Sequence, residues 1–165
     1  ASIRRAARIA DGWCMVPTNT NDRIERDMAT FKGTREAEDL HPTAHLVRLF
    51  EVVCARDEAT ALTQASPYLL TKYESYAQWG MPDVSFNATS SPEAQLKALA
   101  TNRFAIGSPE QVADAILEQH RIGITHLTMR LSWPGMAQAQ ILEAIERVGR
   151  DVLPEVRQRV AEMTN

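Results

Sequence analysis

Residues 46–55 read LVRLFEVVCA, and this segment determines which kind of sheet the chain can build. As a strand it carries apolar side chains on both faces, with Arg48 and Glu51 as the exceptions. One face holds Leu46, Phe50, Val52 and Cys54, and the other holds Val47, Leu49 and Val53. Strands that are apolar on both faces are typical of parallel sheets with helices on each side. Because a helical stretch begins at Asp57, the segment predicts one strand–helix unit of an α/β fold.

The sequence before this strand predicts a helix, a strand and a second possible helix. Residues 3–10 place small and apolar side chains at helical spacing, and Gly12 follows them as a stop signal. A short apolar run over 13–16 predicts a strand, and residues 22–31 predict a possible helix within a polar, turn-rich segment. The chain therefore enters the central strand through a helix–strand–loop unit.

The sequence after the central strand alternates between helix and strand signals. The stripe Leu69, Tyr73 and Tyr76 predicts a helix that ends near Gly80. A polar excursion over 81–103 follows, with one short helix over 93–100. The segment Ser108-Pro109-Glu110-Gln111 is a capping box with the proline that helices favour at their first position.

Residues 124–133 then alternate as a strand, and a last helix begins near Ile141. We expect Pro154 to kink or end that helix, since proline lacks an amide hydrogen. Strands separated by helices imply a parallel sheet, so the fold class is α/β.

Length and composition limit the classes of function. The chain has 165 residues, enough for one domain with a buried core, and 44% of them are hydrophobic. Its formal net charge of −3 argues against binding nucleic acid through phosphate neutralisation. No apolar run is long enough for a membrane span, and no signal-peptide pattern is visible, so we expect a cytoplasmic protein without membrane contact. Two cysteines, Cys14 and Cys54, cannot build a disulfide framework and are expected to be reduced.

Few residues carry a recognisable chemical motif. The glycine-rich and phosphate-loop signatures of nucleotide-binding proteins are absent. His41 and His45 are four residues apart, but Pro42 lies between them and no third ligand is nearby, so no metal site is expected. Arg130 is more informative, because it falls on the strand face opposite Leu127, Met129, Leu131 and Trp133. If those apolar residues pack under helices, Arg130 points the other way, which in a barrel would be the interior. A buried arginine needs an anion or an acceptor, so the alternatives are a bound ligand and a salt bridge with Glu51.

Two tryptophans stand at strand ends. Trp13 and Trp133 each precede a turn, where an aromatic ring can stack on a planar cofactor or line a pocket. Core packing is the alternative interpretation of both.

Several segments, in order, resemble one family. They are RRAARIADGW at 4–13, EVVCA at 51–55, the pattern Tyr73-x-x-Tyr76-x-x-Trp79-Gly80, GSPEQVA at 107–113, Arg130-x-x-Trp133-Pro134-Gly135-Met136, and VLP at 152–154. Together they resemble the carboxyl-terminal half of luciferase-like flavin-dependent oxidoreductases. The resemblance implies part of a (β/α)8 TIM barrel, covering about the last three strands and their helices.

The resemblance also implies a function. The expected activity is that of a flavin-dependent monooxygenase that uses reduced FMN and O2 on a small organic substrate, with a separate reductase as a candidate source of the flavin. A deazaflavin-dependent dehydrogenase or reductase, which transfers hydride, is the alternative within the same fold. Segment 81–103 lies where the family often has a mobile lid.

The length of the chain sets a third alternative. A closed barrel needs at least about 200 residues, and the matched motifs belong to the family's second half. Most catalytic side chains are therefore expected in an absent first half, and none is assigned here. Because open strand edges invite association, we expect a homo-oligomer or pairing with the missing half. The third alternative is therefore not an enzyme but a non-catalytic half-barrel that associates through its open sheet edge.

The resemblance assigns expected site residues position by position. Ser2, Arg130 and Trp133 are expected to bind the cofactor, Ser2 near the flavin phosphate at a helix amino terminus. The residues expected to line the substrate pocket are Trp13, Cys14, Met15 and Thr18.

Overall fold

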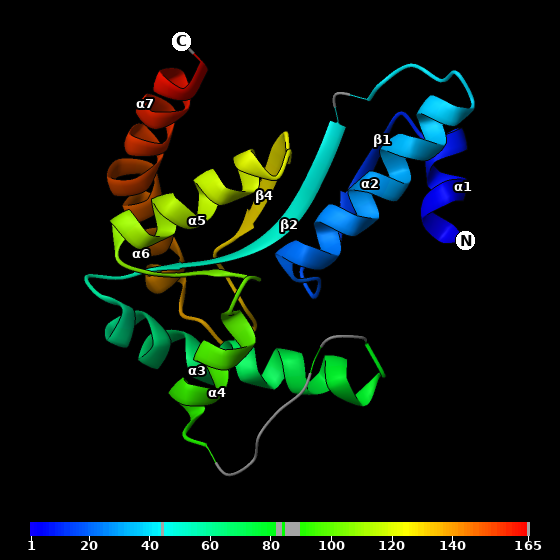
Figure 1. Ribbon diagram of the computed structural model, residues 1–165. Coiled ribbons are helices and arrows are strands. Elements are labelled where there is room, and N and C mark those ends of the chain that lie inside the picture. Colours follow the sequence, from blue (N-terminus) through cyan, green and yellow to red (C-terminus); the bar gives the residue numbers. More distant parts are fainter. Residues whose placement is uncertain (44, 82–83, 85–89, 165) are drawn as a thin grey trace.

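The chain forms one parallel sheet with helices packed around it (Figure 1). The computed structural model describes residues 1–43, 45–81, 84 and 90–164. The strands are β1 (Gly12–Met15), β2 (His45–Cys54), β3 (Ala105–Gly107) and β4 (His126–Arg130). The helices are α1 (Ser2–Ile9), α2 (Asn21–Ala37), α3 (Glu58–Gln78), α4 (Pro92–Ala100), α5 (Pro109–Arg121), α6 (Gln138–Arg147) and α7 (Leu153–Thr164).

Strand β2 is the centre of the sheet. Its first residues pair with β1, where Gly12 lies opposite His45, and its last residues pair with β3. Strand β4 pairs with the middle of β2, where Glu51 lies opposite Arg130. All these pairings are parallel, so the α/β class with a parallel sheet is confirmed. The sheet has four strands, whereas the sequence predicts three. The additional strand, β3, is only three residues long, which is too short to give an alternating pattern in the sequence.

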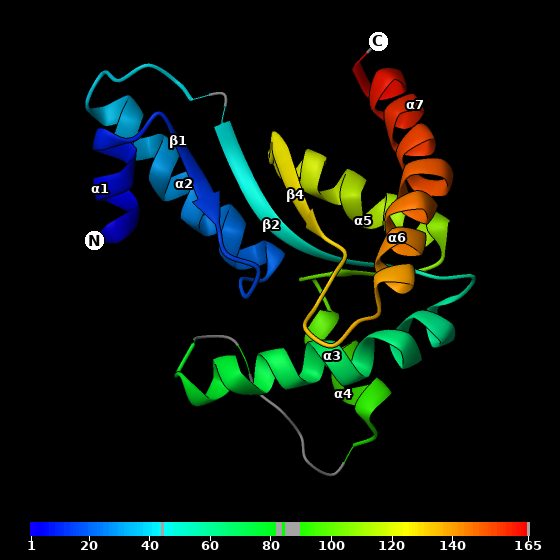
Figure 2. The ribbon, with the colours of Figure 1, turned by 180° about the vertical axis from the view of Figure 1, so that it is seen from behind.

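Helices cover one face of β2 along its whole length. Leu46 packs with α1 and α2, while Phe50, Val52 and Cys54 pack with α5 and a turn over Val148–Val152. On the opposite face the second half of β2 is covered, where Glu51 is buried and Val53 packs against α3 and α4. Figure 2 shows α3 and α4 on one side of the curved strand and α5 on the other. The first half of this second face carries Val47 and Leu49, which are only half-buried.

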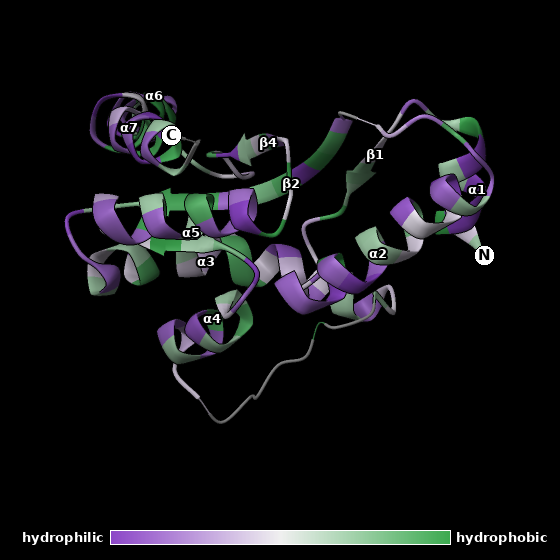
Figure 3. Cartoon of the chain, turned by 45° about the horizontal axis from the view of Figure 1, so that its top comes forward, coloured by the Kyte–Doolittle hydropathy of each residue, from purple (hydrophilic) through white to green (hydrophobic). Residues whose placement is uncertain are grey.

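Hydropathy follows this arrangement. Figure 3 shows β1 and much of β2 in green, whereas the helices alternate between green and purple. Each helix therefore buries one apolar stripe and exposes a polar one, as amphipathic helices in globular domains do. Among the described residues, no helix has both the length and the apolar character that a membrane crossing requires.

The structure corrects three expected elements. The possible helix over 22–31 extends over Asn21–Ala37, with Gly33 inside it. The expected strand over 124–133 ends at Arg130. Pro154 does not end the last helix, because a wider π-helical turn, Val148–Val152, precedes it and the helix continues as α7. Such a turn relieves the clash between a proline ring and the preceding carbonyl groups.

The excursion over 81–103 falls partly outside the described residues, which omit 82–83 and 85–89. Its described helix, α4, is anchored to α3 through the buried side chains of Leu96 and Leu99. A lid in this segment stays a prediction.

Candidate functional site

A cavity of about 530 Å³ lies at the carboxyl end of β4, between that strand end and one face of α3. Helix α3 presents its side chains at helical spacing, and the loop after β4 closes the other wall. The lining residues are Pro67, Tyr68, Thr71, Lys72, Ser75, Tyr76, Trp79, Arg130, Ser132, Trp133 and Pro134. In a parallel barrel this end of the strands is where active sites form.

A buried carboxylate holds the walls of this cavity together. Glu51 is almost completely buried, and its Oε2 accepts a 2.9 Å hydrogen bond from the indole Nε1 of Trp133. Its Oε1 accepts from the ammonium of Lys72, and the Tyr73 hydroxyl donates to the same oxygen at 3.3 Å. Three elements, β2, α3 and the loop after β4, therefore converge on one side chain. A carboxylate with this many donors is satisfied although it is buried.

Two cations stand beside this carboxylate. Lys72 forms an ion pair with Glu51, and Arg130 lies further away, with its Nη1 3.8 Å from Glu51 Oε1. Burial lowers the pKa of Lys72, while the hydrogen bond and charge of Glu51 act in the opposite direction. The Lys72 ammonium also lies 5.3 Å from the ring centroid of Tyr76, within the range of a cation–π contact.

Tyr73 stays protonated in this environment. Burial is the largest reason why its pKa rises above the ordinary value, and the negative charge of Glu51 adds to the effect. Its hydroxyl also lies 3.4 Å from the carbonyl of Pro17. Tyr73 therefore connects the loop after β1 with the Glu51 carboxylate of β2.

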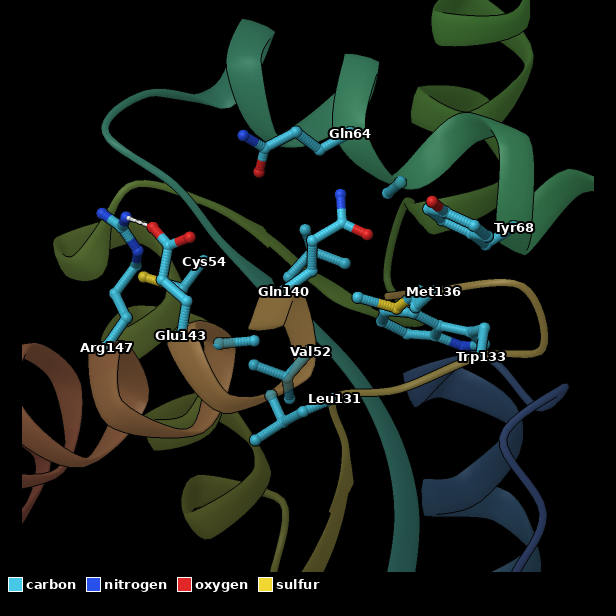
Figure 4. A pocket seen from close by; sticks show the side chains of 13 residues that line it. Val52, Cys54, Gln64, Tyr68, Leu131, Trp133, Met136, Gln140, Glu143 and Arg147 are labelled. Atoms are coloured by element: carbon cyan, nitrogen blue, oxygen red, sulfur yellow. Dashed lines mark hydrogen bonds and ion pairs between the residues drawn. The ribbon is translucent and has the colours of Figure 1, made fainter. Parts of the chain in front are cut away.

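A second, smaller cavity of about 110 Å³ lies between α3, α6 and the end of β2 (Figure 4). Figure 4 shows Trp133, Met136 and Tyr68 gathered on one side, with Cys54, Glu143 and Arg147 on the other. Trp133 and Tyr68 line both cavities, so they form the partition between them. The thiol of Cys54 is buried, and burial raises its pKa, which keeps it in the neutral form.

The structure brings together two of the expected cofactor residues, Arg130 and Trp133. Arg130 lies beside Glu51, so the ion pair offered as one alternative from the sequence is present. Trp133 differs from its expected position on the side of Leu131. Because β4 ends at Arg130, the chain turns, and the Trp133 indole packs instead against buried apolar side chains of α3, next to Val53.

The other expected residues lie elsewhere. Trp13 stacks on Phe31 of α2, with ring centroids 5.5 Å apart, and Met15 is buried in the same cluster. Both side chains therefore face helices, whereas Cys14 between them is exposed on the opposite face of β1. These positions do not contribute to either cavity described above, and their expected role in a substrate pocket stays a prediction.

Ser2 and Thr18 also lie outside both cavities. Ser2 is exposed at the first position of α1, and α1 lies on the far side of β1 from β4 (Figure 1). Thr18 is completely buried, and within the described part of the chain its hydroxyl has no hydrogen-bond partner. No role for either side chain follows from its contacts.

Arg48 is a structural residue that the motifs did not single out. It is completely buried on the helix-covered face of β2, where it donates to Asn21 Oδ1 at 2.6 Å and to the carbonyl of Asn19 at 2.9 Å. It also donates to the carbonyl of Arg103 at 3.1 Å and to the side chain of Gln119. Burial lowers its pKa to about 10, so it is still charged at neutral pH. Arg48 thereby ties the loop between β1 and α2 to the central strand.

Comparison with known proteins places this arrangement in a family. The family model described as luciferase-like monooxygenase matches residues 1–126. Among curated proteins, none matches the chain.

Solved structures share the fold. Monooxygenase RslO1 from Streptomyces bottropensis is 16% identical, with a TM-score of 0.72 over 93% of this chain and 44% of that one. The oxygenating constituent of 3,6-diketocamphane monooxygenase from Pseudomonas putida, in complex with FMN, is 20% identical, with a TM-score of 0.70 over 93% and 45%. The coenzyme F420-dependent tetrahydromethanopterin reductase of Methanopyrus kandleri is 18% identical, with a TM-score of 0.59 over 93% and 48%.

The chain spans less than half the length of these three proteins, so its sheet is part of a luciferase-like barrel. The expected partial (β/α)8 fold is confirmed. Since the family model covers most of the sequence, the chain belongs to the luciferase-like monooxygenase family.

Proposed function

We propose that this chain is the carboxyl-terminal part of a flavin-dependent monooxygenase that uses reduced FMN and O2 on a small organic substrate. The observation that carries the proposal is the cavity at the carboxyl end of β4, which is lined by aromatic rings and two cations. Membership of the luciferase-like family and the likeness to an FMN-bound oxygenating subunit support it. Catalytic side chains are expected outside this chain.

The residues of the cavity fit a flavin or a substrate bound beside one. Flat aromatic side chains suit a planar ring system, and the exposed part of the Arg130 guanidinium suits a negatively charged group. A bound flavin would supply the redox chemistry. The chain would contribute Arg130 to bind an anionic group, Trp133 to wall the pocket and exclude water, and Glu51 to hold both in position. Ser2, at the amino end of α1, is the proposed contact for the flavin phosphate.

A deazaflavin is the alternative cofactor. The likeness to an F420-dependent reductase covers 93% of the chain, as large a share as the likeness to the FMN-bound oxygenase. In that case the bound cofactor would transfer hydride, and the proposed roles of Arg130 and Trp133 would be unchanged.

The expected partners follow from the open sheet. Among the described residues, β1 and β4 each pair with β2 alone, so each leaves one edge of its backbone without a neighbouring strand. We propose that the first half of a barrel, or a second copy of the chain, pairs with these edges, and that a separate reductase supplies reduced flavin. A non-catalytic half-barrel would use the same edges without binding flavin.

Titration of the purified chain with FMN and with F420, followed by cofactor fluorescence and by mass in solution, tests these alternatives. The monooxygenase proposal expects FMN to bind more tightly than F420 and expects Arg130→Gln to weaken that binding. The matched control is Arg150→Gln, since Arg150 is exposed in the turn Val148–Val152 and, among the described residues, forms its ion pair with Asp151. Preference for F420 would favour the dehydrogenase alternative. Failure of a folded dimer to bind either cofactor would overturn both in favour of the non-catalytic half-barrel.

A further inference from the structure

The larger cavity has a surplus of positive charge. None of the eleven described residues that line it is acidic, whereas Lys72 and Arg130 are both cationic. Among the residues that the structure describes, Glu51 is the carboxylate in contact with these two cations. One negative charge therefore faces two positive charges. A cavity with an unmatched cation favours an anionic ligand over a neutral one.

Arg130 is the cation that remains available. The oxygens of Glu51 already accept from Lys72, Tyr73 and Trp133. At 3.8 Å the Arg130 guanidinium is beyond hydrogen-bond distance from that carboxylate, and 40% of its side chain is exposed. A guanidinium offers several donors in a planar fork, which matches the two oxygens of a carboxylate. Arg130 can therefore bind a second carboxylate without giving up its place beside Glu51.

The remaining walls of the cavity are aromatic. Tyr68, Tyr76, Trp79 and Trp133 contribute rings, and the rings of Tyr76 and Trp79 lie 5.7 Å apart. Trp79 is 73% exposed in spite of its size, so a large apolar surface is available at the mouth of the cavity. Rings of this kind bind flat, apolar bodies through stacking and edge contacts.

The anion that fits is a carboxylate rather than a phosphate. Phosphate sites commonly use the amide groups of a helix amino terminus, and no residue in the lining belongs to the first turn of a helix. The surplus is also a single positive charge, whereas a phosphate monoester carries up to two negative charges.

We infer that this cavity selects an aromatic carboxylate as its organic substrate, with the carboxylate on Arg130 and the ring between Trp133 and Tyr76. The substrate role rests on the proposed flavin-dependent oxidation, but the binding preference does not require a flavin. It can therefore be measured on the chain alone.

Four probes built on one fused bicyclic carbon skeleton test the inference by isothermal titration calorimetry. They are 2-naphthoate, its neutral amide, 2-naphthyl phosphate and the saturated decahydronaphthalene-2-carboxylate. We expect 2-naphthoate to bind at least about tenfold more tightly than the amide, as for a lost charge-assisted contact. The phosphate and the saturated acid are also expected to bind more weakly than 2-naphthoate.

Variants locate the binding on Arg130. Arg130→Gln is expected to weaken the binding of 2-naphthoate by at least about tenfold while leaving the affinity for the amide nearly unchanged. Arg130→Lys keeps the charge and loses the fork, so it should give an intermediate affinity. Arg150→Gln should match the unmodified chain. If Arg130→Gln does not fold, Arg130→Lys and the comparison of the four probes on the unmodified chain still test whether the cavity prefers an aromatic carboxylate.

Equal binding of acid and amide, or no binding of 2-naphthoate by the folded chain, would overturn the inference. Tighter binding of the naphthyl phosphate would overturn it in favour of a phosphate site, and equal binding of the saturated acid would remove the aromatic requirement. FMN titrated in parallel separates the two proposals. A chain that binds FMN without preferring 2-naphthoate refutes only the substrate class. A chain that prefers 2-naphthoate without binding a flavin refutes only the flavin function.

Discussion

Replacing Glu51 by glutamine should be among the most destabilising conservative changes in this chain. The substitution keeps the shape of the side chain but removes its charge and gives one oxygen position to an amide that donates. That amide would face Lys72 or the indole of Trp133, both of which are donors. The Lys72 side chain is only 12% exposed, so its ammonium would lose its counter-charge at a position where its contact with water, through the cavity, is limited.

The size of the effect follows from this burial. Removing one partner of a fully buried ion pair costs about 3–5 kcal/mol. Because Lys72 retains some exposure, we expect Glu51→Gln to lower the free energy of unfolding by roughly 2–4 kcal/mol. The surface pair Lys97–Glu58 provides a matched control, since its side chains are 59% and 37% exposed. Glu58→Gln should cost at most about 1 kcal/mol.

Urea unfolding at pH 7, followed by circular dichroism, measures both variants on the same scale. The double variant with Lys72→Met should recover part of the loss, because it no longer buries an unpaired ammonium. If Glu51→Gln costs no more than Glu58→Gln, the carboxylate is not the element that joins β2, α3 and the loop after β4.

Three further measurements test other parts of the structure. Because burial raises the pKa of Tyr73, only the unfolded chain loses this proton above pH 10, so the folded state loses stability as the pH rises. Above pH 10 the free energy of unfolding of the unmodified chain should fall by up to about 1.4 kcal/mol per pH unit more than that of Tyr73→Phe. Parallel pH profiles of the two proteins would contradict this. A thiol-reactive disulfide reagent should modify exposed Cys14 rapidly and buried Cys54 only on unfolding, so Cys14→Ser should abolish the fast phase. Ser108→Ala should lower the free energy of unfolding by about 1 kcal/mol through loss of a helix cap, whereas Ser108→Thr should lose less.

Local signals explain why most of the fold could be predicted. The capping box at Ser108 and Gln111 is confirmed by hydrogen bonds in both directions, because all its parts lie within four residues. The central strand was expected over 46–55 and is observed over His45–Cys54. In both cases the residues that define the element also stabilise it.

Tertiary contacts explain the failures. The three residues of β3 form a strand only because the end of β2 lies beside them. Trp133 leaves the face that strand alternation predicts, since the Glu51 carboxylate offers its indole a buried acceptor. No pattern in the sequence marks Lys72 as a residue of the site. A lysine on an amphipathic helix is usually solvated, and only the fold shows that it reaches the same carboxylate.

The two charged residues within the apolar strand show what a sequence can say about a site. Arg48 and Glu51 are an odd number of positions apart, so they lie on opposite faces, and alternation alone predicts this. It does not say which face closes over helices and which opens into a cavity. Arg48 donates hydrogen bonds to neutral oxygen atoms of the surrounding loops and helices, so its role is to hold these segments together. Glu51 instead forms ion pairs with the two cations that line the cavity. A charge in a buried strand therefore marks a polar network, and the charges of its partners decide whether that network can also bind a ligand.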